Sequence, residues 1–462
     1  MQNVVLEKDM AVALRDAGDI RVRLFTASID LKHHPVIKSK EKLRAKYYAV
    51  LEHFVKQCVS DSMFVDARLE EYKKAILRDN VALVITKTNK NSVIKGIVND
   101  PLKPWMRKYR YLLLSDLALV LVDEDSVQKA FTMFESYLSK KQLILLGSLR
   151  NILLADEQFA ICHSFTQNGI HQFRANHEFW QQNETRLIVT ANMSAGKSTL
   201  INALVGKVIS CMKSEASTAA IHYIYDKPFE DGHSSKWDGI LAMDADNKTL
   251  MDYDMRNSTG RIYVATYFST FVTKAKRRFC FIDTPGVNSA INREHGKLTR
   301  KALREESYDK LIYVFNANRL GTDEEFRHLK FITENASKDK VIFVLNKLDD
   351  FNKKDDSIEE SIEGVRKDLY ALGYENPTIC PISAYFALLV KKRLIGEALS
   401  EDEQDSFKLF AKKFNKTDYD LSRFYHPGIG SVDGNGGELE EAAMKCGLYG
   451  LEYTLYGGIN IQ

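Results

Sequence analysis

The sequence predicts a mainly α-helical N-terminal domain, followed by an α/β domain whose mostly parallel sheet is flanked by helices. Only four of the 24 glycines precede residue 181, and glycine is unfavourable inside helices but needed where the backbone turns tightly. After that point, short β-branched runs alternate with helical segments, which is the order that gives βαβ units. The polar stretch Gln181–Thr185 marks the predicted boundary, which divides the chain into 1–180 and 181–462.

Apolar side chains at helical spacing predict the N-terminal helices. One stripe runs over Leu43–Val55 and a second over Ala67–Leu77. The same spacing predicts helices over Tyr109–Val122 and Ser126–Leu154, and two prolines between residues 100 and 105 mark a break before them. This half contains no motif that carries chemistry, so its role stays open.

Short β-branched and apolar runs predict the strands of the second domain. They are Arg186–Thr190, Ala220–Tyr225, Ile262–Thr266, Arg278–Ile282, Lys310–Phe315 and Lys340–Leu345. Helical segments separate several of them, at Ser198–Val205, Arg293–Glu306, Glu324–Asn335 and Ile358–Leu372. This alternation predicts parallel strands joined by helical crossovers.

Composition and charge exclude several classes of protein. The 462 residues are 45% hydrophobic and 27% charged, which excludes a mostly disordered chain, a collagen-like fibre and a disulfide miniprotein. The net charge of +3 is too small to indicate a nucleic-acid partner or a polybasic membrane protein. We therefore expect no nucleic-acid binding.

The six cysteines show no C-x-x-C spacing, and residues 1–30 show no signal peptide, so we expect reduced thiols in a cytoplasmic protein. The apolar run Leu112–Val122 is too short to span a bilayer and is predicted to be a buried helix. Membrane contact is therefore expected to be peripheral. We interpret His33 and His34 as surface or capping residues, because adjacent side chains point apart.

The first chemical motif follows the strand predicted at Arg186–Thr190 and opens a helix, which is the context of a phosphate-binding P-loop. Backbone N–H groups of such a loop converge on phosphate oxygens, helped by the helix N-terminus. Lys197 is expected on the β- and γ-phosphates and Ser198 on Mg²⁺. Alanine replaces the usual first glycine, so we expect a slightly altered turn there. The motif reads Ala191-Asn192-Met193-Ser194-Ala195-Gly196-Lys197-Ser198-Thr199.

A second motif, Asp283-Thr284-Pro285-Gly286, ends the strand predicted at Arg278–Ile282. An aspartate at this place can hold Mg²⁺ through water. Gly286 can offer its N–H to the γ-phosphate and lets the following segment move. The tetrapeptide alone is weak evidence, because an ordinary turn can have the same sequence.

A third motif, Asn346-Lys347-Leu348-Asp349, closes the strand predicted at Lys340–Leu345. The carboxylate of Asp349 can accept two hydrogen bonds from the N1–H and 2-amino group of guanine, and adenine lacks this donor pair. The aliphatic stem of Lys347 can lie over the base. Ser383-Ala384, after the apolar run Ile379–Ile382, fits a final loop that contacts the base.

The order phosphate, metal, base, with each motif at the carboxyl end of a strand, predicts one guanine-nucleotide site in a P-loop GTPase domain. The predicted reaction is GTP and water to GDP and phosphate, with Mg²⁺ as cofactor. Catalysis is expected to depend on positioning and electrostatics, without a covalent intermediate.

With these motifs in place, the chain resembles the dynamin superfamily, and in particular bacterial dynamin-like GTPases. The resemblance covers residues 175–455 and rests on residues 192–204, the two later motifs, and the stretch Asn316–Glu325. It implies a GTPase stimulated by GTP-dependent dimerisation or assembly through the GTPase domain. It also implies contact with a membrane surface or with a partner dynamin-like chain.

The resemblance assigns further roles to the site. Thr218, with Ser217 as the alternative, matches the threonine that contacts Mg²⁺ and the attacking water. Met193 stands where dynamins proper carry glutamine, and no glutamine follows Gly286, so the usual water-positioning amide is missing. Ser194 is then expected to help bind a monovalent cation, K⁺ or Na⁺, whose charge acts near the β–γ bridge.

Residues 446–452 resemble the start of the last GTPase-domain helix, and the chain ends at Gln462, where most dynamin-like proteins continue into a helical stalk. The N-terminal helices, another chain or a longer form of this chain would have to supply that stalk. Two other functions stay open. One is a regulatory or assembly GTPase outside the dynamins, and the other is a GTP-gated interaction module with little hydrolysis.

Overall fold

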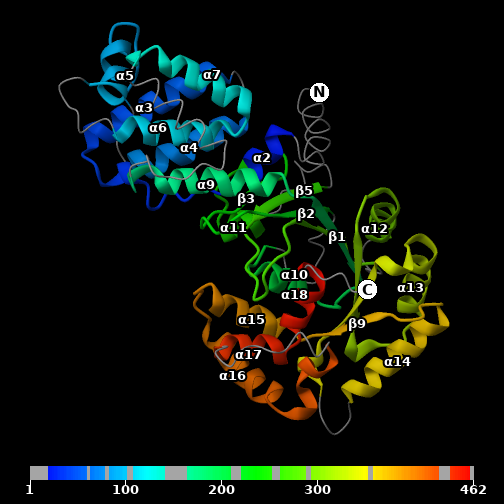
Figure 1. Ribbon diagram of the computed structural model, residues 1–462. Coiled ribbons are helices and arrows are strands. Elements are labelled where there is room, and N and C mark those ends of the chain that lie inside the picture. The colour runs from blue at the N-terminus through cyan, green and yellow to red at the C-terminus, as the bar shows by residue number, and fades with distance from the viewer. Residues whose placement is uncertain are drawn as a thin grey trace. The chain divides into compact units, whose positions relative to one another are not determined.

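The computed structural model of the chain (Figure 1) describes residues 19–59, 63–78, 83–100, 108–140, 164–209, 220–251, 261–287, 293–351, 357–425 and 437–457. Its contacts divide the chain into two compact units. The first unit comprises residues 1–182 together with 227–236 and 240–244, and the second comprises residues 183–226, 237–239 and 245–462. Two short segments from within the predicted second domain therefore belong to the first unit, which their position in the sequence does not reveal.

The first unit is helical. Its α-helices are α2 (Ile20–Thr26), α3 (Glu41–Cys58), α4 (Met63–Leu77), α5 (Lys90–Val98), α6 (Lys108–Leu121), α7 (Glu124–Glu135) and α9 (Ser164–Trp180). Nearly every side chain of α6 is buried, because α3, α4, α5, α7 and α9 all pack against it. A helix that is apolar on all sides has to be surrounded in this way. The run Leu112–Val122 is thus a buried helix, as predicted.

One helix prediction is wrong in its extent. We expected a single helix over Ser126–Leu154, but α7 begins at Glu124 and ends at Glu135. Asp123 sets the start by accepting a hydrogen bond from the backbone N–H of Ser126 (2.8 Å). At the other end, the hydroxyl of Ser136 donates to the carbonyl of Met133 (2.7 Å), and such local bonds compete with the helical ladder. Residues 141–154 lie outside the described residues.

The segment 227–236 is held in the helical unit by polar contacts. The ammonium group of Lys227 lies 2.6 Å from a carboxylate oxygen of Asp231, and both side chains are 1% exposed. The same carboxylate accepts the backbone N–H of Ile29 (3.0 Å), and the hydroxyl of Ser28 donates to the carbonyl of Phe229 (2.6 Å). A paired and hydrogen-bonded charge can be buried in this way. The short strands β3 (Ser235–Trp237) and β4 (Leu241–Ala242) occupy this part of the chain.

The second unit is built around a sheet in which seven strands follow the order β5-β2-β6-β1-β7-β8-β9. The pairs β1–β6, β1–β7, β7–β8, β8–β9 and β2–β5 are parallel, whereas β2 and β6 are antiparallel. The mostly parallel sheet expected from the sequence is therefore confirmed. The strands are β1 (Glu184–Ala191), β2 (Ile221–Asp226), β5 (Arg261–Thr266), β6 (Arg278–Asp283), β7 (Lys310–Asn316), β8 (Val341–Asn346) and β9 (Thr378–Pro381).

Helices lie on both sides of this sheet. In Figure 1, α12, α13 and α14 lie to one side of it, and α10, α15 and α18 lie to the other. Covering both faces explains why β2, β6 and β8 are buried throughout and why parallel strands have nearly continuous apolar sequences. The helices are α10 (Lys197–Val205), α11 (Asn247–Met251), α12 (Arg293–Glu305), α13 (Asp323–Asn335), α14 (Ile358–Ala371), α15 (Ala384–Leu394), α16 (Glu401–Phe414), α17 (Glu438–Lys445) and α18 (Leu448–Tyr456).

The described part of the chain has no helix that is both long enough and apolar enough to cross a membrane. The cysteines that the structure describes, Cys58, Cys280, Cys380 and Cys446, are free and buried. Burial raises the pKa of the Cys380 and Cys446 thiols to about 12, so these thiols stay protonated at neutral pH.

Candidate functional site

The register of the sheet brings the predicted motifs to one edge. Val189 of β1 pairs with Asp283 of β6, Ala191 of β1 pairs with Val314 of β7, and Asn316 of β7 pairs with Asn346 of β8. The strands are parallel, so their carboxyl ends meet along the same edge, where ligands bind in open α/β sheets.

The P-loop, residues 191–199, joins β1 to α10, and its conformation explains why residue 196 is glycine. Gly196 has a φ of +85°, and a Cβ atom there would lie 2.4 Å from Nδ2 of Asn346. Glycine is therefore required both by the backbone conformation and by the close approach of Asn346. Ser194 also has a positive φ, of 63°, in a region that few residues other than glycine adopt.

Ala191 does not adopt the positive φ that would favour glycine at this position. Ala191 is the last residue of β1, is fully buried, and does not have a positive φ. A Cβ atom is tolerated here because the residue continues the strand. In this chain the positive φ values of the loop fall at Ser194 and Gly196 instead.

Lys197 and Asp283 form a buried ion pair at the centre of the edge. Lys197 is 8% exposed and Asp283 is fully buried. Lys197 begins α10, and the following residues Ser198 and Thr199 lie in the first turn of the same helix. Lys197 and Ser198 thus lie at the N-terminus of α10. Asp283 lies at the carboxyl end of β6, the strand adjacent to β1.

The segment after Asp283 is held against the P-loop. The hydroxyl of Thr284 donates to the carbonyl of Val189 (2.8 Å), and the backbone N–H of Met193 donates to the carbonyl of Val287 (3.2 Å). The hydroxyl of Thr299 on α12 donates to the carbonyl of Pro285 (2.6 Å). Gly286 lies between these anchors, and a Cβ atom there would be in ordinary contact with Met193, 3.6 Å from its Cα.

The base loop, residues 346–351, is connected to the P-loop and to the loop at residues 383–384. Asn346 donates through Nδ2 to the carbonyl of Ala195 (2.9 Å) and accepts at Oδ1 the backbone N–H of Ala384 (2.9 Å). The hydroxyl of Ser383 donates to Oδ1 of Asp349 (2.7 Å). Lys347 adopts a positive φ of 70°, and its side chain approaches Gly196.

Burial raises the pKa of the Asp349 carboxyl above its usual value, and the hydrogen bond from Ser383 acts in the opposite direction. Burial makes the ionised form of this carboxyl unfavourable unless it has hydrogen-bond partners. Donors on a ligand would therefore stabilise the ionised carboxylate. The sequence predicts that Asp349 reads the edge of a guanine base, and that role stays a prediction.

The connecting loop, residues 316–322, links the P-loop and the base loop, and our sequence reasoning assigned it no role. Asn316 donates through Nδ2 to the carbonyl of Ser194 (3.3 Å) and accepts the backbone N–H of Asn318 (3.1 Å). Asn318 in turn donates to a carboxylate oxygen of Asp350 (3.1 Å). The sequence did carry one indication that this loop belongs to the site, because Asn316 ends a buried strand, as Asp283 and Asn346 do.

Two titratable groups on α13 support the connecting loop and β1. Glu325 accepts the backbone N–H of Gly321 (3.1 Å), and burial raises the pKa of this carboxyl to about 7. Nε2 of His328 lies 3.0 Å from the hydroxyl of Thr190, and burial lowers the pKa of His328 to about 4. His328 is therefore neutral at pH 7. Thr190 is adjacent to the P-loop, so α13 contacts the strand that leads into this loop.

The predicted residues 192–199, 283–286, 346–349, 383 and 384 thus come together along one edge of the sheet. Thr218 and its alternative Ser217 lie outside the described residues, so their roles stay predictions. Lys413, which contacts the base loop, was also missed, because nothing in the sequence near it indicates that contact.

A sequence model of the dynamin family matches residues 187–348, from β1 to the base loop. These residues form a GTPase domain of the dynamin superfamily. The family was predicted from the P-loop, the later motifs and the stretch at residues 316–325, and that prediction is confirmed.

Proteins similar to this chain come from several organisms. An uncharacterised protein of Caldicellulosiruptor is 28% identical over 250 residues, which cover 51% of this chain and 58% of that protein. A probable transmembrane GTPase, FZO-like, of Arabidopsis thaliana chloroplasts is 25% identical over 210 residues, which cover 44% of this chain and 20% of that protein. Dynamin-like protein 1 of Campylobacter jejuni is 24% identical over 253 residues, covering 45% and 33%. The chain thus spans at most 58% of the length of these relatives.

Solved structures similar to the chain include one of an oligomerised bacterial dynamin pair, which is 18% identical with a TM-score of 0.36 and covers 80% of this chain and 70% of that one. Another is Era of Aquifex aeolicus bound to GDP and AlF4⁻. It is 18% identical with a TM-score of 0.27, and the match covers 48% of this chain and 59% of that one.

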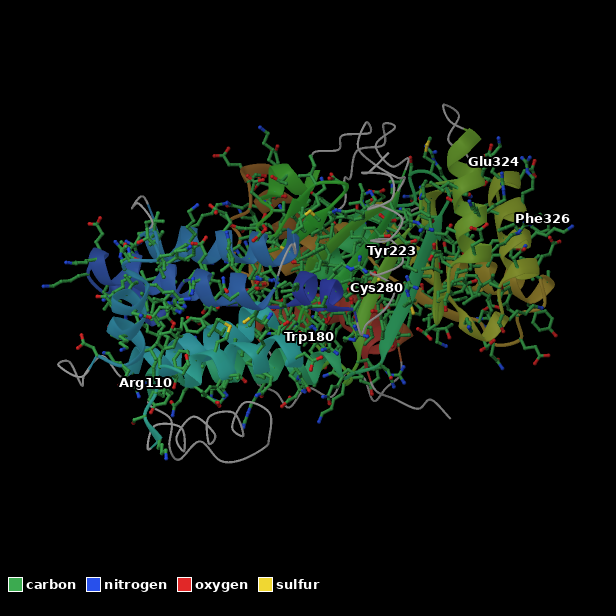
Figure 2. All side chains as sticks on the ribbon, turned by 90° about the horizontal axis from the view of Figure 1, so that it is seen from above. Arg110, Trp180, Tyr223, Cys280, Glu324 and Phe326 are labelled. Atoms are coloured by element: carbon green, nitrogen blue, oxygen red, sulfur yellow. The ribbon has the colours of Figure 1, made fainter. Side chains whose placement is uncertain are left out.

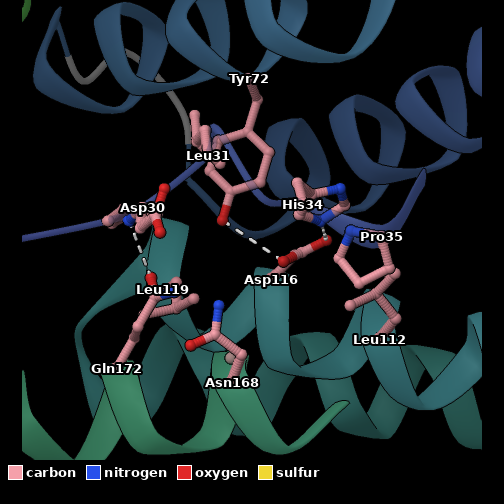
Figure 3. A pocket seen from close by; sticks show the side chains of 12 residues that line it. Asp30, Leu31, His34, Pro35, Tyr72, Leu112, Asp116, Leu119, Asn168 and Gln172 are labelled. Atoms are coloured by element: carbon pink, nitrogen blue, oxygen red, sulfur yellow. Dashed lines mark hydrogen bonds and ion pairs between the residues drawn. The ribbon is translucent and has the colours of Figure 1, made fainter. Parts of the chain in front are cut away.

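A second polar cluster lies in the helical unit and corrects one prediction. His34, interpreted as a surface or capping residue, is 5% exposed. As Figure 3 shows, it faces Asp116 of α6, with Nε2 lying 3.0 Å from a carboxylate oxygen. The hydroxyls of Tyr47 (2.5 Å) and Tyr72 (3.4 Å) also donate to this carboxylate. Adjacent side chains do point apart, since His33 is exposed, but one of the two points into the core.

The cavity beside Asp116 has a volume of about 20 Å³, enough for one water molecule. Asp30, Asn168 and Gln172 also line it. Because it is so small, we interpret this cluster as a means of satisfying a buried carboxylate.

Proposed function

We propose that the protein binds GTP at the edge formed by the P-loop, Asp283 and the base loop, and hydrolyses it to GDP and phosphate. The observation that carries the proposal is the continuous set of contacts along this edge. Lys197 pairs with Asp283, Asn346 joins the base loop to the P-loop, and Ser383 contacts Asp349. These contacts support a site in which loops far apart in the sequence would supply an anion-binding end and a base-reading end.

At the phosphate end, the backbone N–H groups of Asn192–Thr199 and the N-terminus of α10 would surround the phosphates. Lys197 would contribute its positive charge to the β- and γ-phosphates, beside Asp283, with which it pairs. Gly286 would offer its N–H to the γ-phosphate and report its presence to the following segment.

The donors at this edge fit Mg²⁺, which prefers hard oxygen ligands and is commonly held by one or two protein oxygens together with phosphates and water. The hydroxyl of Ser198 would be a direct ligand, and Thr218 a second. Asp283 would hold the ion through water. Bound Mg²⁺ would supply positive charge that stabilises the negative charge of the phosphates during hydrolysis. The residues of the chain orient the phosphates and exclude competing contacts.

At the base end, Asp349 would accept the N1–H and 2-amino hydrogens of guanine, and Lys347 would cover one face of the ring. Asn346 and Ala384 keep the loops around the base in contact. Since Ser383 already orients the carboxylate, little rotational freedom remains to be lost when guanine binds.

Hydrolysis would depend on charge near the β–γ bridge, because Met193 has no amide to orient water. We propose that Ser194, whose backbone lies in a strained region, helps to hold K⁺ or Na⁺ there. The cation would replace the charge that an arginine finger supplies in other GTPases.

We also propose that GTP promotes self-association through the GTPase domain. Two large apolar side chains support this: Met193 in the P-loop is 42% exposed and Phe326 on α13 is 55% exposed. Figure 2 shows Phe326 with Glu324 on the outer side of α13. Burying both in a dimer would remove apolar surface from water and order the segments beside the γ-phosphate. The assembled form is the one we expect at a membrane surface or with a partner dynamin-like chain.

The decisive experiment measures phosphate release per molecule against protein concentration, in K⁺ and in Na⁺, with and without liposomes of anionic lipid. A dynamin-like enzyme turns over faster per molecule as its concentration rises. A rate that stays flat, with or without liposomes, favours a regulatory GTPase outside the dynamins. Tight GTP binding without phosphate release in a single turnover favours an interaction module.

A further inference from the structure

Lys413 contacts the base loop from an element outside the recognised motifs. It lies in the last turn of α16 (Glu401–Phe414). Its ammonium group donates to the carbonyl of Asp349 (2.6 Å) and to the carbonyl of Phe351 (2.5 Å). It also lies 4.6 Å from the centroid of the Tyr419 ring, close enough for a cation–π interaction.

These two carbonyls stand on either side of Asp350 at the end of a single short 3₁₀ turn, Leu348–Asp350. A turn of this length has few hydrogen bonds of its own. One cation that binds both carbonyls therefore fixes the backbone from which the Asp349 side chain extends. Charged hydrogen bonds of this kind are about twice as strong as neutral ones.

Asp349 is thereby held from two directions. Ser383 fixes the carboxylate through a hydrogen bond, and Lys413 fixes the backbone of the same residue. The positive charge of Lys413 also favours the ionised carboxylate, since it lowers the pKa of Asp349 against the effect of burial.

We propose that Lys413 is a positioning residue for guanine recognition, which holds the Asp349 backbone so that its carboxylate is oriented before the base arrives. The proposal rests on the proposed GTP site and adds α16 to it. It predicts an effect on binding of the base, because pre-ordering a group reduces the entropy lost on binding. The chemical step at the γ-phosphate lies at the other end of the site and should be little affected.

The test compares wild type with Lys413→Met, which keeps the length of the side chain but removes its donors and charge. The adjacent and exposed Lys412→Met is the matched control. Affinities for GDP and for inosine diphosphate, which lacks the 2-amino group, are measured by calorimetry, together with steady-state GTP hydrolysis. We expect Lys413→Met to bind GDP roughly ten-fold more weakly, as loss of a charged hydrogen bond implies. Its preference for GDP over inosine diphosphate should fall, and kcat should stay within about two-fold of wild type.

Two further variants separate positioning from general stability. Lys413→Arg keeps charge and donors and should restore most of the GDP affinity. Lys413→Gln keeps a neutral donor and should be intermediate, and it replaces Lys413→Met if that variant does not fold. A structural role alone would lower the unfolding temperature of the nucleotide-free protein and reduce kcat, with the base preference unchanged.

The proposal is overturned if Lys413→Met, or Lys413→Gln in its place, binds GDP within about two-fold of wild type with the same base preference. It is also overturned if Lys412→Met loses as much affinity. If wild type binds no guanine nucleotide, the proposed function itself fails. If wild type binds GDP and the Lys413 variants bind it equally well, the proposed function stands and only the role of Lys413 is excluded.

Discussion

The side-chain amide of Asn346 donates to the carbonyl of Ala195 across 2.9 Å, and it lies where any side chain at position 196 would have to be. The base loop and the P-loop are therefore in direct contact. Because Asn346 also accepts the backbone N–H of Ala384, one side chain joins three loops. A change at either end of the site can consequently affect the other.

Lys197→Ala should abolish GTP and GDP binding, because the phosphates lose their main cation. The buried Asp283 also loses a paired charge, so the nucleotide-free protein should be destabilised, by roughly 3–5 kcal/mol. Calorimetric titration with GDP and urea unfolding measure the two effects. Lys330→Ala, at an exposed position on α13, is the control. Affinity close to that of wild type in Lys197→Ala would remove this lysine from the site.

Asp349→Asn should relax the preference for guanine, because an amide cannot accept both the N1–H and the 2-amino hydrogen. The affinity for xanthosine triphosphate, which carries an oxygen at position 2, should rise relative to the affinity for GTP. The ratio of the two dissociation constants measures this, and Asp350→Asn, which keeps an acceptor for Asn318, serves as the matched control. An unchanged ratio in Asp349→Asn would exclude the carboxylate from base recognition.

The site was largely predictable because its motifs follow strands with clear apolar sequences. Strands β1, β6, β7 and β8 lie within two residues of the predicted ranges, and their ends place Lys197, Asp283 and Asp349 at one edge. The contacts of Lys413 and Asn318 were not predictable, because they join segments far apart in the sequence through single side chains.

The same limit explains the errors in the helical unit. Periodicity identifies an apolar face, so α3, α4 and α6 were found, but it did not show that α7 ends at Glu135. It also could not show that His34 turns inward, because the partner that makes burial favourable, Asp116, is 82 residues away.

Asn316→Ala should weaken the connection between the P-loop and the connecting loop, since it removes the donor to the Ser194 carbonyl. The positive φ of Ser194 then loses its restraint, and we expect kcat/KM for GTP to fall roughly ten-fold, about 1.4 kcal/mol. Asn318→Ala, at an exposed position, should have a smaller effect, because it breaks only the contact with Asp350. Steady-state kinetics rank the two variants. The assigned connection is wrong if Asn318→Ala is the more damaging change.

Asp116→Leu should destabilise the helical unit by about 2–4 kcal/mol, because it leaves His34 and Tyr47 buried without their acceptor. The Asp116→Asn variant keeps an oxygen acceptor and should lose less. Hydrogen exchange of the amides of α3 and α6 would localise the effect. Equal unfolding free energies for both variants and wild type would show that this carboxylate does not contribute to stability.

Glu325 should make stability depend on pH in a direction opposite to that of a salt-bridged carboxylate. Its pKa is raised to about 7 from 4.5, so the folded protein binds more protons than the unfolded chain between these values. The stabilising contribution is complete below pH 4.5 and is lost as pH rises through 7. Replacing the carboxyl by an amide in Glu325→Gln removes this dependence and keeps an acceptor for Gly321. Relative to the variant, wild type should lose about 2 kcal/mol between pH 5 and pH 8.

Urea unfolding of wild type and Glu325→Gln at pH 5 and pH 8 measures this loss as a difference of differences, which cancels the titration of other groups. Asp368 contributes in the same direction, because its charge also raises the pKa of Glu325, so Asp368→Asn should reduce the effect. The neighbouring Glu324→Gln changes the same charge at an exposed position of α13 and should show no such loss. If Glu324→Gln and Glu325→Gln have the same pH dependence, burial of Glu325 does not control its titration.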